Sequence, residues 1–144
     1  MSAQPPRELI VEADGGSRGN PGQAGAGALV IDAATGEILA ELGRYVGIAS
    51  NNVAEYTGLI AGVTAAIELD PHAVLRVRMD SKLVVEQMSG RWKIKHPATA
   101  ELAAEARHAL TGTPVAFEWI PREQNSRADR LVNEAIDKKL DFRR

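Results

Sequence analysis

The stretch IVEADGGSRGNPG, residues 10–22, is the part of the sequence that decides the fold. Residues 9–13 form a short apolar run of the kind found in β-strands. The run ends on Asp14, and four glycines, one proline and one asparagine follow within the next eight residues. A carboxylate at a strand end, followed by a loop whose glycines let a ligand approach the backbone, is typical of a functional site. The alternative is an ordinary turn that begins with an acidic residue.

The composition indicates one globular domain. Of the 144 residues, 44% are hydrophobic and 25% are charged, which is ordinary for a chain that buries a core. The chain has no cysteine, which excludes disulfides and thiolate metal sites and favours a cytoplasmic location. No apolar run approaches the length of a membrane span, so we expect no membrane partner. The net charge of −2 is unusual for a nucleic-acid-binding protein, but divalent cations bound to acidic residues would reverse the local field.

The pattern of apolar residues predicts the order β-β-β-α-β-α-α-β-α. This order corresponds to an α/β domain with a five-stranded mixed sheet whose first three strands are antiparallel. The expected elements are strands at 9–13, 24–32 and 37–45, a helix at 53–69, a strand at 74–79, helices from 81 and at 99–110, a strand at 115–120 and a helix at 126–139. We expect residues 1–7 to be a disordered lead, residues 8–140 to form the domain, residues 141–144 to be a tail, and the protein to be a monomer.

Asp80 repeats the arrangement at Asp14. The alternating strand at 74–79 ends on Asp80, and a helix begins at once. Strands that are linked through a helix usually run parallel, so we expect both aspartates at the same edge of the sheet. The alternative for Asp80 is an N-cap without further function.

Two further acids, Glu55 and Asp129, lie where helices are expected to begin. Ser50, Asn51 and Asn52 precede the first helix, and a polar loop precedes the last one. The helix dipole favours an acid in a first turn whatever its role, so neither residue is decisive alone.

Together, the four acids predict a metal site. Four carboxylates within a few ångströms repel one another and cannot all stay ionised without compensation. Two Mg²⁺ ions provide it, because Mg²⁺ prefers oxygen ligands and leaves room for water and a phosphate. Such a pair suits in-line displacement at phosphorus, since one ion activates water and the other stabilises the leaving oxygen.

Four motifs closely resemble those of type 1 ribonuclease H: DGGSRGNPG (14–22), SNNVAEY (50–56), DSKLV (80–84) and PREQNSRAD (121–129). The resemblance covers residues 8–139, in order. It implies the ribonuclease H-like fold, with the fourth and fifth strands parallel to the first. It also implies hydrolysis of the RNA strand of an RNA/DNA hybrid, with 5′-phosphate and 3′-hydroxyl ends, two Mg²⁺ ions and Mn²⁺ as a substitute.

The resemblance assigns roles to residues of this chain. Asp14, Glu55, Asp80 and Asp129 match the metal-binding acids of the family, and Asp14 is expected to bridge both ions. The expected contacts to the substrate are Gly15 and Gly16 through their backbone, and Asn20, Ser50, Asn51, Asn52 and Lys82 through their side chains. Amides and short polar groups suit the 2′-hydroxyls that distinguish RNA. Helix capping is the alternative for Asn51 and Asn52, and Lys82 replaces a family glutamine.

Two regions depart from the family pattern. Many members carry a basic handle, an extra helix and loop, where this chain has only RWKIKH (91–96). The chain therefore resembles the handle-less subgroup, and Trp92, Lys93 and Lys95 are the contacts expected there. The loop before Asp129 lacks the family histidine that is associated with product release. Arg122 and Glu123 are candidates for that role, the alternative being a solvated turn that caps the last helix through Asn125.

Two other functions remain open at this point. One is a module that binds hybrids without cleaving them, which the four intact acids disfavour. The other is a different phosphoryl transfer on the same fold, as in resolvases or actin-like ATPases. The asparagine pair 51–52 and the Asn-Pro-Gly motif favour cleavage of hybrids over both.

Overall fold

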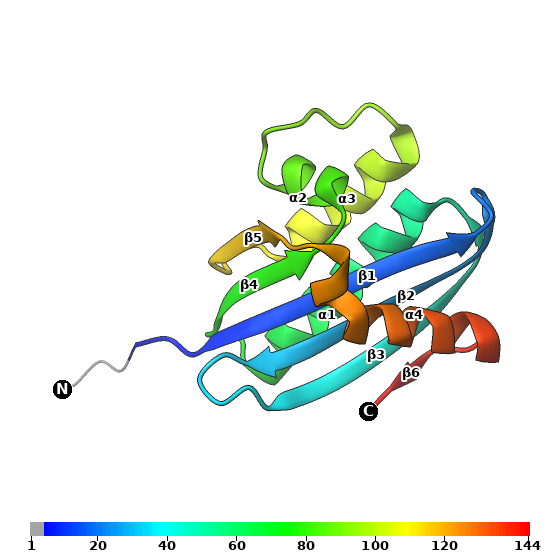
Figure 1. The fold of residues 1–144 in the computed structure, drawn as a ribbon. Coiled ribbons are helices and arrows are strands. Elements are labelled where there is room, and N and C mark those ends of the chain that lie inside the picture. Colours follow the sequence, from blue (N-terminus) through cyan, green and yellow to red (C-terminus); the bar gives the residue numbers. More distant parts are fainter. Residues whose placement is uncertain (1–4) are drawn as a thin grey trace.

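The computed structural model describes residues 5–144, which form a mixed six-stranded sheet with helices on both faces (Figure 1). The order of strands across the sheet is β5-β4-β1-β2-β3-β6. The elements in chain order are β1 (Glu8–Arg18), β2 (Gly22–Asp32), β3 (Ile38–Ala49), α1 (Asn51–Leu69), β4 (Val74–Met79), α2 (Lys82–Met88), α3 (Pro97–Ala109), β5 (Val115–Trp119), the 3₁₀ helix η1 (Arg122–Asn125), α4 (Ser126–Lys138) and β6 (Phe142–Arg143).

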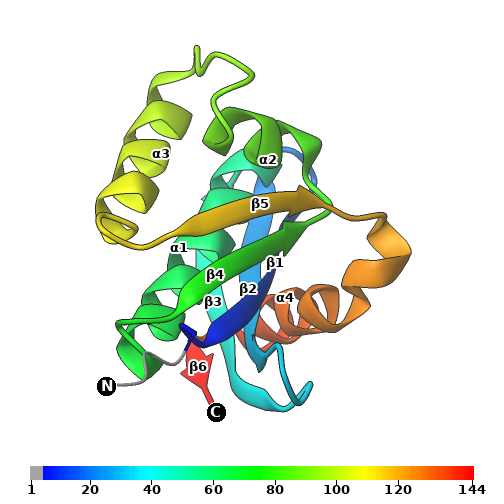
Figure 2. The ribbon, with the colours of Figure 1, turned by 90° about the vertical axis from the view of Figure 1, so that its left-hand side faces the viewer.

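The pairing of the first five strands confirms the predicted topology. β1, β2 and β3 form an antiparallel meander, whereas β4 runs parallel to β1 and β5 runs parallel to β4. The helical segments between parallel strands cross over one face of the sheet (Figure 2). This topology places the end of β4 beside the part of β1 that carries Asp14, which is the arrangement on which the prediction of the site depends.

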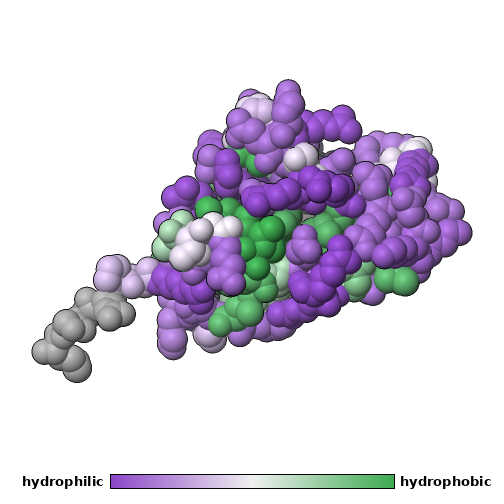
Figure 3. Space-filling view, turned by 60° about the horizontal axis from the view of Figure 1, so that its bottom comes forward, coloured by the Kyte–Doolittle hydropathy of each residue, from purple (hydrophilic) through white to green (hydrophobic). Residues whose placement is uncertain are grey.

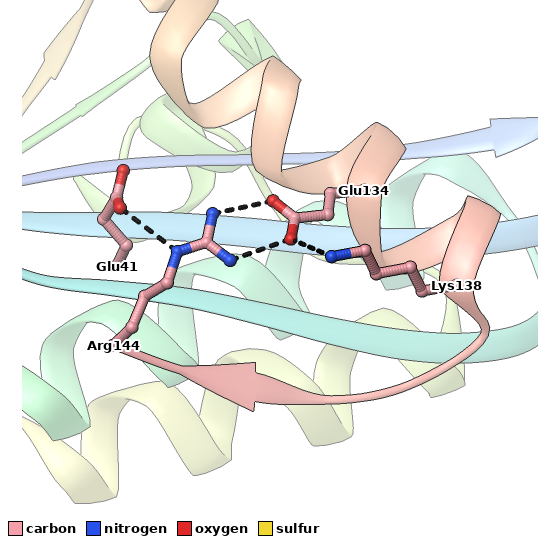
Figure 4. A network of polar contacts seen from close by, with 4 residues as sticks. All are labelled: Glu41, Glu134, Lys138 and Arg144. Carbon is pink, nitrogen blue, oxygen red and sulfur yellow. Dashed lines mark hydrogen bonds and ion pairs between the residues drawn. The ribbon is translucent and has the colours of Figure 1, made fainter.

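The sixth strand, β6, was not predicted. Its two residues pair with Leu42 and Gly43 of β3, within the segment that was expected to be a tail. Figure 4 shows what holds it in place: Arg144 contacts Glu134 of α4 at 2.7 Å and Glu41 of β3 at 3.4 Å, and Lys138 also binds Glu134. A two-residue strand is too short to show an alternating pattern in the sequence. It forms through contacts with distant segments, which local patterns do not reveal.

The glycine-rich stretch after Asp14 was predicted to be a loop, and this prediction was wrong. β1 continues to Arg18 and pairs residue by residue with β2, so that Asp14 lies opposite Gly27 in mid-strand. Only Gly19, with φ of +93°, takes a conformation there that favours glycine. The parallel pairing with β4, by contrast, ends at Glu12, so β1 projects beyond β4 and exposes Asp14 at that edge.

α1, α2 and α3 cover one face of the sheet and enclose the main core (Figures 1 and 2). Ser50 caps α1 by accepting a hydrogen bond from the amide of Val53 at 3.2 Å. α1 therefore begins two residues earlier than predicted, and Glu55 lies beyond its first turn. The helix dipole falls off within the first turn, so it no longer explains an acid at this position.

α4 lies on the opposite face (Figures 1 and 2). A smaller apolar cluster of Leu29, Ile31, Ala128 and Leu131 joins it to β2. On the side of the molecule seen in Figure 3, hydrophobic residues form a limited area between hydrophilic ones. The apolar cluster holds α4 against the meander, and the N-terminal end of α4 is directed toward the edge where β4 ends (Figure 2).

Two peripheral segments were also the subject of predictions. Residues 1–4 of the predicted disordered lead lie outside the described residues, while Arg7 is fixed by an ion pair with Asp32 at 2.7 Å. Residues 89–96, between α2 and α3, contain no helix, which agrees with the predicted lack of a handle. Within residues 5–144, none of the helices has the length and apolar character needed to cross a membrane.

Candidate active site

The four predicted acids line one cavity of about 410 Å³. Asp14 comes from β1, Glu55 from α1, Asp80 from the residue after β4, and Asp129 from the first turn of α4. Four separate elements thus deliver one carboxylate each. Gly15, Gly16, Ser17 and Asn51 complete much of the surrounding wall.

Asp14 is the most strongly perturbed acid of the group. Its burial, and then the charges of Asp80, Asp129 and Glu55, raise the pKa of Asp14 to about 8. A hydrogen bond from the amide of Gly15 to Asp14 Oδ1, 2.9 Å long, opposes this shift by stabilising the charged form. The contribution of three neighbouring carboxylates shows that the acids are close enough to repel one another.

Glu55 is perturbed for the same reasons. Its burial and the charge of Asp80 raise the pKa of Glu55 to about 7, although a hydrogen bond with Ser81 lowers it. Perturbed acids that meet in a cavity are a physical indication of a functional site.

A charged cluster lies next to the acids. Glu12 is almost completely buried and accepts hydrogen bonds from the guanidinium of Arg127 at 3.1 and 3.3 Å. Arg78 lies 3.6 Å from the same carboxylate. These three residues connect β1, α4 and β4, which are the elements that carry Asp14, Asp129 and Asp80.

The predicted substrate-binding asparagines form a linked group at one side of the cavity. Asn51 Oδ1 accepts a hydrogen bond from the amide of Ser17 at 2.8 Å, and Asn20 Oδ1 accepts one from the amide of Asn51 at 3.2 Å. Each carboxamide therefore uses its oxygen within the protein, and within residues 5–144 neither carboxamide nitrogen donates a hydrogen bond. Asn52 is exposed, and Ser50 caps α1.

Gly15 and Gly16 differ in their surroundings. A Cβ atom on Gly15 would lie 2.1 Å from the carbonyl carbon of Ala54 and 2.2 Å from the amide nitrogen of Glu55. On Gly16 it would meet only Val132 Cγ1, at 3.7 Å. Gly15 is thus required for the close approach of α1 to β1, and Gly16 leaves the backbone accessible from the cavity.

The remaining predicted residues fall into two locations. Arg122 lines the cavity, whereas Glu123 is exposed and is not part of its wall. Trp92 and Lys93 line a separate hollow, and Lys95 is exposed in the same connection. Their roles stay predictions.

Lys82 is exposed at the start of α2, where its Nζ lies 5.9 Å from the centre of the Trp119 ring. This distance suits a cation–π contact. Trp119 itself had no predicted role.

Several residues around the site were missed. Arg18 and Asn133 line the cavity and are joined by a hydrogen bond of 3.2 Å. Asn133 follows Asp129 by one helical turn, a spacing that could have identified it. Asn125 is buried and contacts Asp80, but a single polar residue in a polar loop gives no sequence signal of burial.

Comparison with known proteins then identifies the family. The family model described as reverse transcriptase-like matches residues 12–135. A ribonuclease HI of Halobacterium salinarum is 41% identical over 140 residues, which cover 93% of this chain and 68% of that protein. The chain belongs to the type 1 ribonuclease H family.

Two further relatives extend the likeness of this ribonuclease H domain. A bifunctional protein of Mycobacterium tuberculosis is 53% identical over 131 residues, covering 90% of this chain and 36% of that protein. The domain thus spans about a third of the length of such relatives. The crystal structure of LC11-RNase H1 in complex with an RNA/DNA hybrid is 43% identical, with a TM-score of 0.86, and the match covers 91% of this chain and 98% of that one.

The acids of this ribonuclease H domain have the donor chemistry of a site for divalent metal ions. The donors are carboxylate oxygens, and after burial the charges of Asp80, Asp129 and Glu55 raise the pKa of Asp14, so hard divalent cations would relieve this repulsion. Within residues 5–144, no three Asp, Glu or His side chains form a ready-made ligand set for one ion. The chemistry of the donor set fits divalent cations, which family members require.

Proposed function

We propose that this ribonuclease H domain is an endonuclease that hydrolyses the RNA strand of RNA/DNA hybrids and leaves 5′-phosphate and 3′-hydroxyl ends. The observation that carries the proposal is the meeting of Asp14, Glu55, Asp80 and Asp129 in one open cavity. The names of its relatives support the reaction, since one is a ribonuclease HI and another is solved with a hybrid.

The four acids would hold two Mg²⁺ ions, with Mn²⁺ as a substitute, and Asp14 would bridge them. When bound, such a pair activates water for attack at phosphorus and stabilises the leaving oxygen. The chain's own contribution is to hold the carboxylates in place before the cations arrive. Burial of Asp14 and Glu55 strengthens their electrostatic interactions, because the cavity excludes part of the water.

Recognition of the RNA strand is assigned to the wall formed by Asn20, Asn51, Gly15 and Gly16. The carboxamide nitrogens of the two asparagines are available to donate to ribose 2′-hydroxyls or phosphate oxygens. Gly16 has no side chain, which allows the RNA strand to approach the acids. Ser50, Asn52, Lys82, Trp92, Lys93 and Lys95 extend the proposed contact surface. The compartment and the oligomeric state, a cytoplasmic monomer, stay predictions from the sequence.

The Asp14→Asn variant tests the proposal. It keeps the shape of the side chain and removes the charge of the bridging ligand, so cleavage of a fluorescent hybrid in Mg²⁺ should fall by several orders of magnitude. Folding should be retained. Because the folded-state pKa of Asp14 is raised from 3.8 to about 8, ionisation of this group costs stability as pH rises through that range. The metal-free variant should therefore become more stable relative to wild type between these pH values.

Three outcomes would contradict the proposal. Turnover at the wild-type rate in Asp14→Asn would exclude Asp14 as a metal ligand. Tight binding of hybrid by the wild type with no cleavage in Mg²⁺ or Mn²⁺ would favour a binding module instead. Cleavage of a duplex or hydrolysis of ATP in place of the hybrid would favour another phosphoryl transfer.

A further inference from the structure

We propose that Asn125 is a positioning residue that fixes the carboxylate of Asp80 for metal binding. Asn125 ends η1 and is only 1% exposed. Within the described chain its side chain does not cap α4. Instead, Asn125 Nδ2 donates to Asp80 Oδ1 at 2.7 Å and to the carbonyl oxygen of Ala13 at 2.9 Å.

The chemistry of the partners determines the direction of this amide. The carbonyl of Ala13 and the carboxylate of Asp80 are both acceptors, so only the NH₂ end of Asn125 can face them. One nitrogen thus joins the residue before Asp14 to the side chain of Asp80. The same side chain therefore fixes the spacing between β1 at Asp14 and the end of β4 at Asp80.

The opposite end of the amide supports this assignment. Among residues 5–144, Asn125 Oδ1 is buried without a hydrogen-bond partner. A buried acceptor left unpaired is unfavourable, and an apolar side chain at this position would avoid it. The asparagine is therefore explained by what its nitrogen does, which is to donate to Ala13 and Asp80.

Asp80 is held from a second direction by the same segment. Trp119, at the end of β5, donates from Nε1 to the carbonyl oxygen of Asp80 at 3.2 Å. The backbone of Asp80 and one carboxylate oxygen are thus both fixed by residues 119–125. Oδ2 is then the oxygen of Asp80 left for a cation, in an orientation that is set before binding.

The inference rests on the proposed function, and its test separates the two. Metal affinity is measured as the rise in melting temperature of the metal-free protein with Mg²⁺ or Mn²⁺, which needs no activity. The Mg²⁺ dependence of hybrid cleavage is measured in parallel. If the wild type shows neither a metal-induced rise nor cleavage, the proposed function fails before Asn125 is considered.

Two variants of Asn125 are compared with a control. Asn125→Ala removes the donor, and Asn125→Asp keeps the shape but places an acceptor against two acceptors. Loss of a partner that orients a metal ligand typically weakens metal affinity about 10- to 100-fold, so both variants should need that much more Mg²⁺ for half-maximal rate. KM for the hybrid at saturating Mg²⁺ should stay unchanged. Gln124→Ala, at the exposed neighbouring residue, should behave as wild type.

The result that would overturn the proposal is equally specific. A purely structural side chain would lower the melting temperature of both variants while the metal-induced rise and the Mg²⁺ dependence stayed as in the wild type. Failure of both variants to fold at 10 °C would also overturn it, because the side chain would then be needed for the fold and not for Asp80. If Gln124→Ala also needed more Mg²⁺ than the wild type for half-maximal rate, that result would count against a specific role of Asn125.

Discussion

Replacement of Gly15 by alanine tests whether the contact between β1 and α1 sets the separation of Asp14 and Glu55. A Cβ atom on Gly15 would lie 2.1 Å from the carbonyl carbon of Ala54, whereas ordinary contact begins at 3.4 Å. The atoms that it meets are backbone, so the helix must move by about 1.3 Å, the difference between these two distances. Overpacking of this kind costs about 1–3 kcal/mol, and the rigid neighbour places Gly15→Ala at about 3 kcal/mol.

The same movement displaces the acids. A misplacement of about 1 Å in a reacting group can lower the rate about 100-fold. We therefore expect kcat/KM of Gly15→Ala to fall by about that factor, and its melting temperature to fall by about 6–12 °C. Calorimetry of the metal-free protein and a hybrid cleavage assay in Mg²⁺ measure the two effects.

Gly16→Ala is the matched control, since its added methyl group would meet only Val132 Cγ1 at 3.7 Å. Its unfolding free energy should stay within about 0.5 kcal/mol of wild type. If the methyl group obstructs the RNA strand, KM alone should rise. Wild-type stability and activity in Gly15→Ala, or equal effects of the two substitutions, would refute the argument from close contact.

Three further predictions concern the periphery. The double change Lys93→Ala with Lys95→Ala should raise KM and should make the binding constant for the hybrid less dependent on salt. The slope of log K against log salt should fall by roughly 0.9 for each lost phosphate contact, which is the value for B-DNA. An unchanged slope would place the hybrid elsewhere. Arg122→Ala should lower the steady-state kcat several-fold and leave the single-turnover rate unchanged. Glu123 lies outside the cavity wall, so Glu123→Ala should alter neither rate. Equal effects of the two substitutions would contradict a role of Arg122 in product release. Glu134→Gln should lower the melting temperature at pH 7. The hydrogen-bonded ion pairs with Arg144 and Lys138 (Figure 4) lower the pKa of Glu134 from 4.5 to about 2, so the loss in melting temperature should shrink as pH falls through that range. A loss that does not depend on pH would exclude the ion pairs as its cause.

The parts of the fold that the sequence predicted correctly are those set by local patterns. Alternation of apolar residues identifies β4, and the helical link to β5 makes these strands parallel. Parallel pairing of β1 with β4 then brings Asp14 and Asp80 to the same edge, as predicted from the chain order. The approximate convergence of the acids was therefore readable without coordinates.

The parts that the sequence did not predict depend on contacts between distant segments. Gly15 and Gly16 have turn-like composition, yet pairing with β2 keeps them extended. β6 pairs with β3 because Phe142 packs where Gly43 has no side chain. Asn125 is buried because its side-chain nitrogen donates to the carbonyl oxygen of Ala13 and to Asp80 Oδ1. None of these partners is near in sequence, so local propensity carries no information about them.

The charged cluster of Glu12, Arg78 and Arg127 explains how the acids can be held together without cations. In β1, β4 and α4, a member of this cluster stands two residues before the aspartate of the site. The acids repel one another, since the charges of Asp80, Asp129 and Glu55 add to the effect of burial in raising the pKa of Asp14, and that repulsion acts to separate the three elements. The cluster opposes the separation, because the buried carboxylate of Glu12 would lose one of its two partners if either arginine moved away. The same three elements are therefore held together by the ion pairs of the cluster and pushed apart by the carboxylates of the cavity. The acids stay close together, and bound cations would stabilise them.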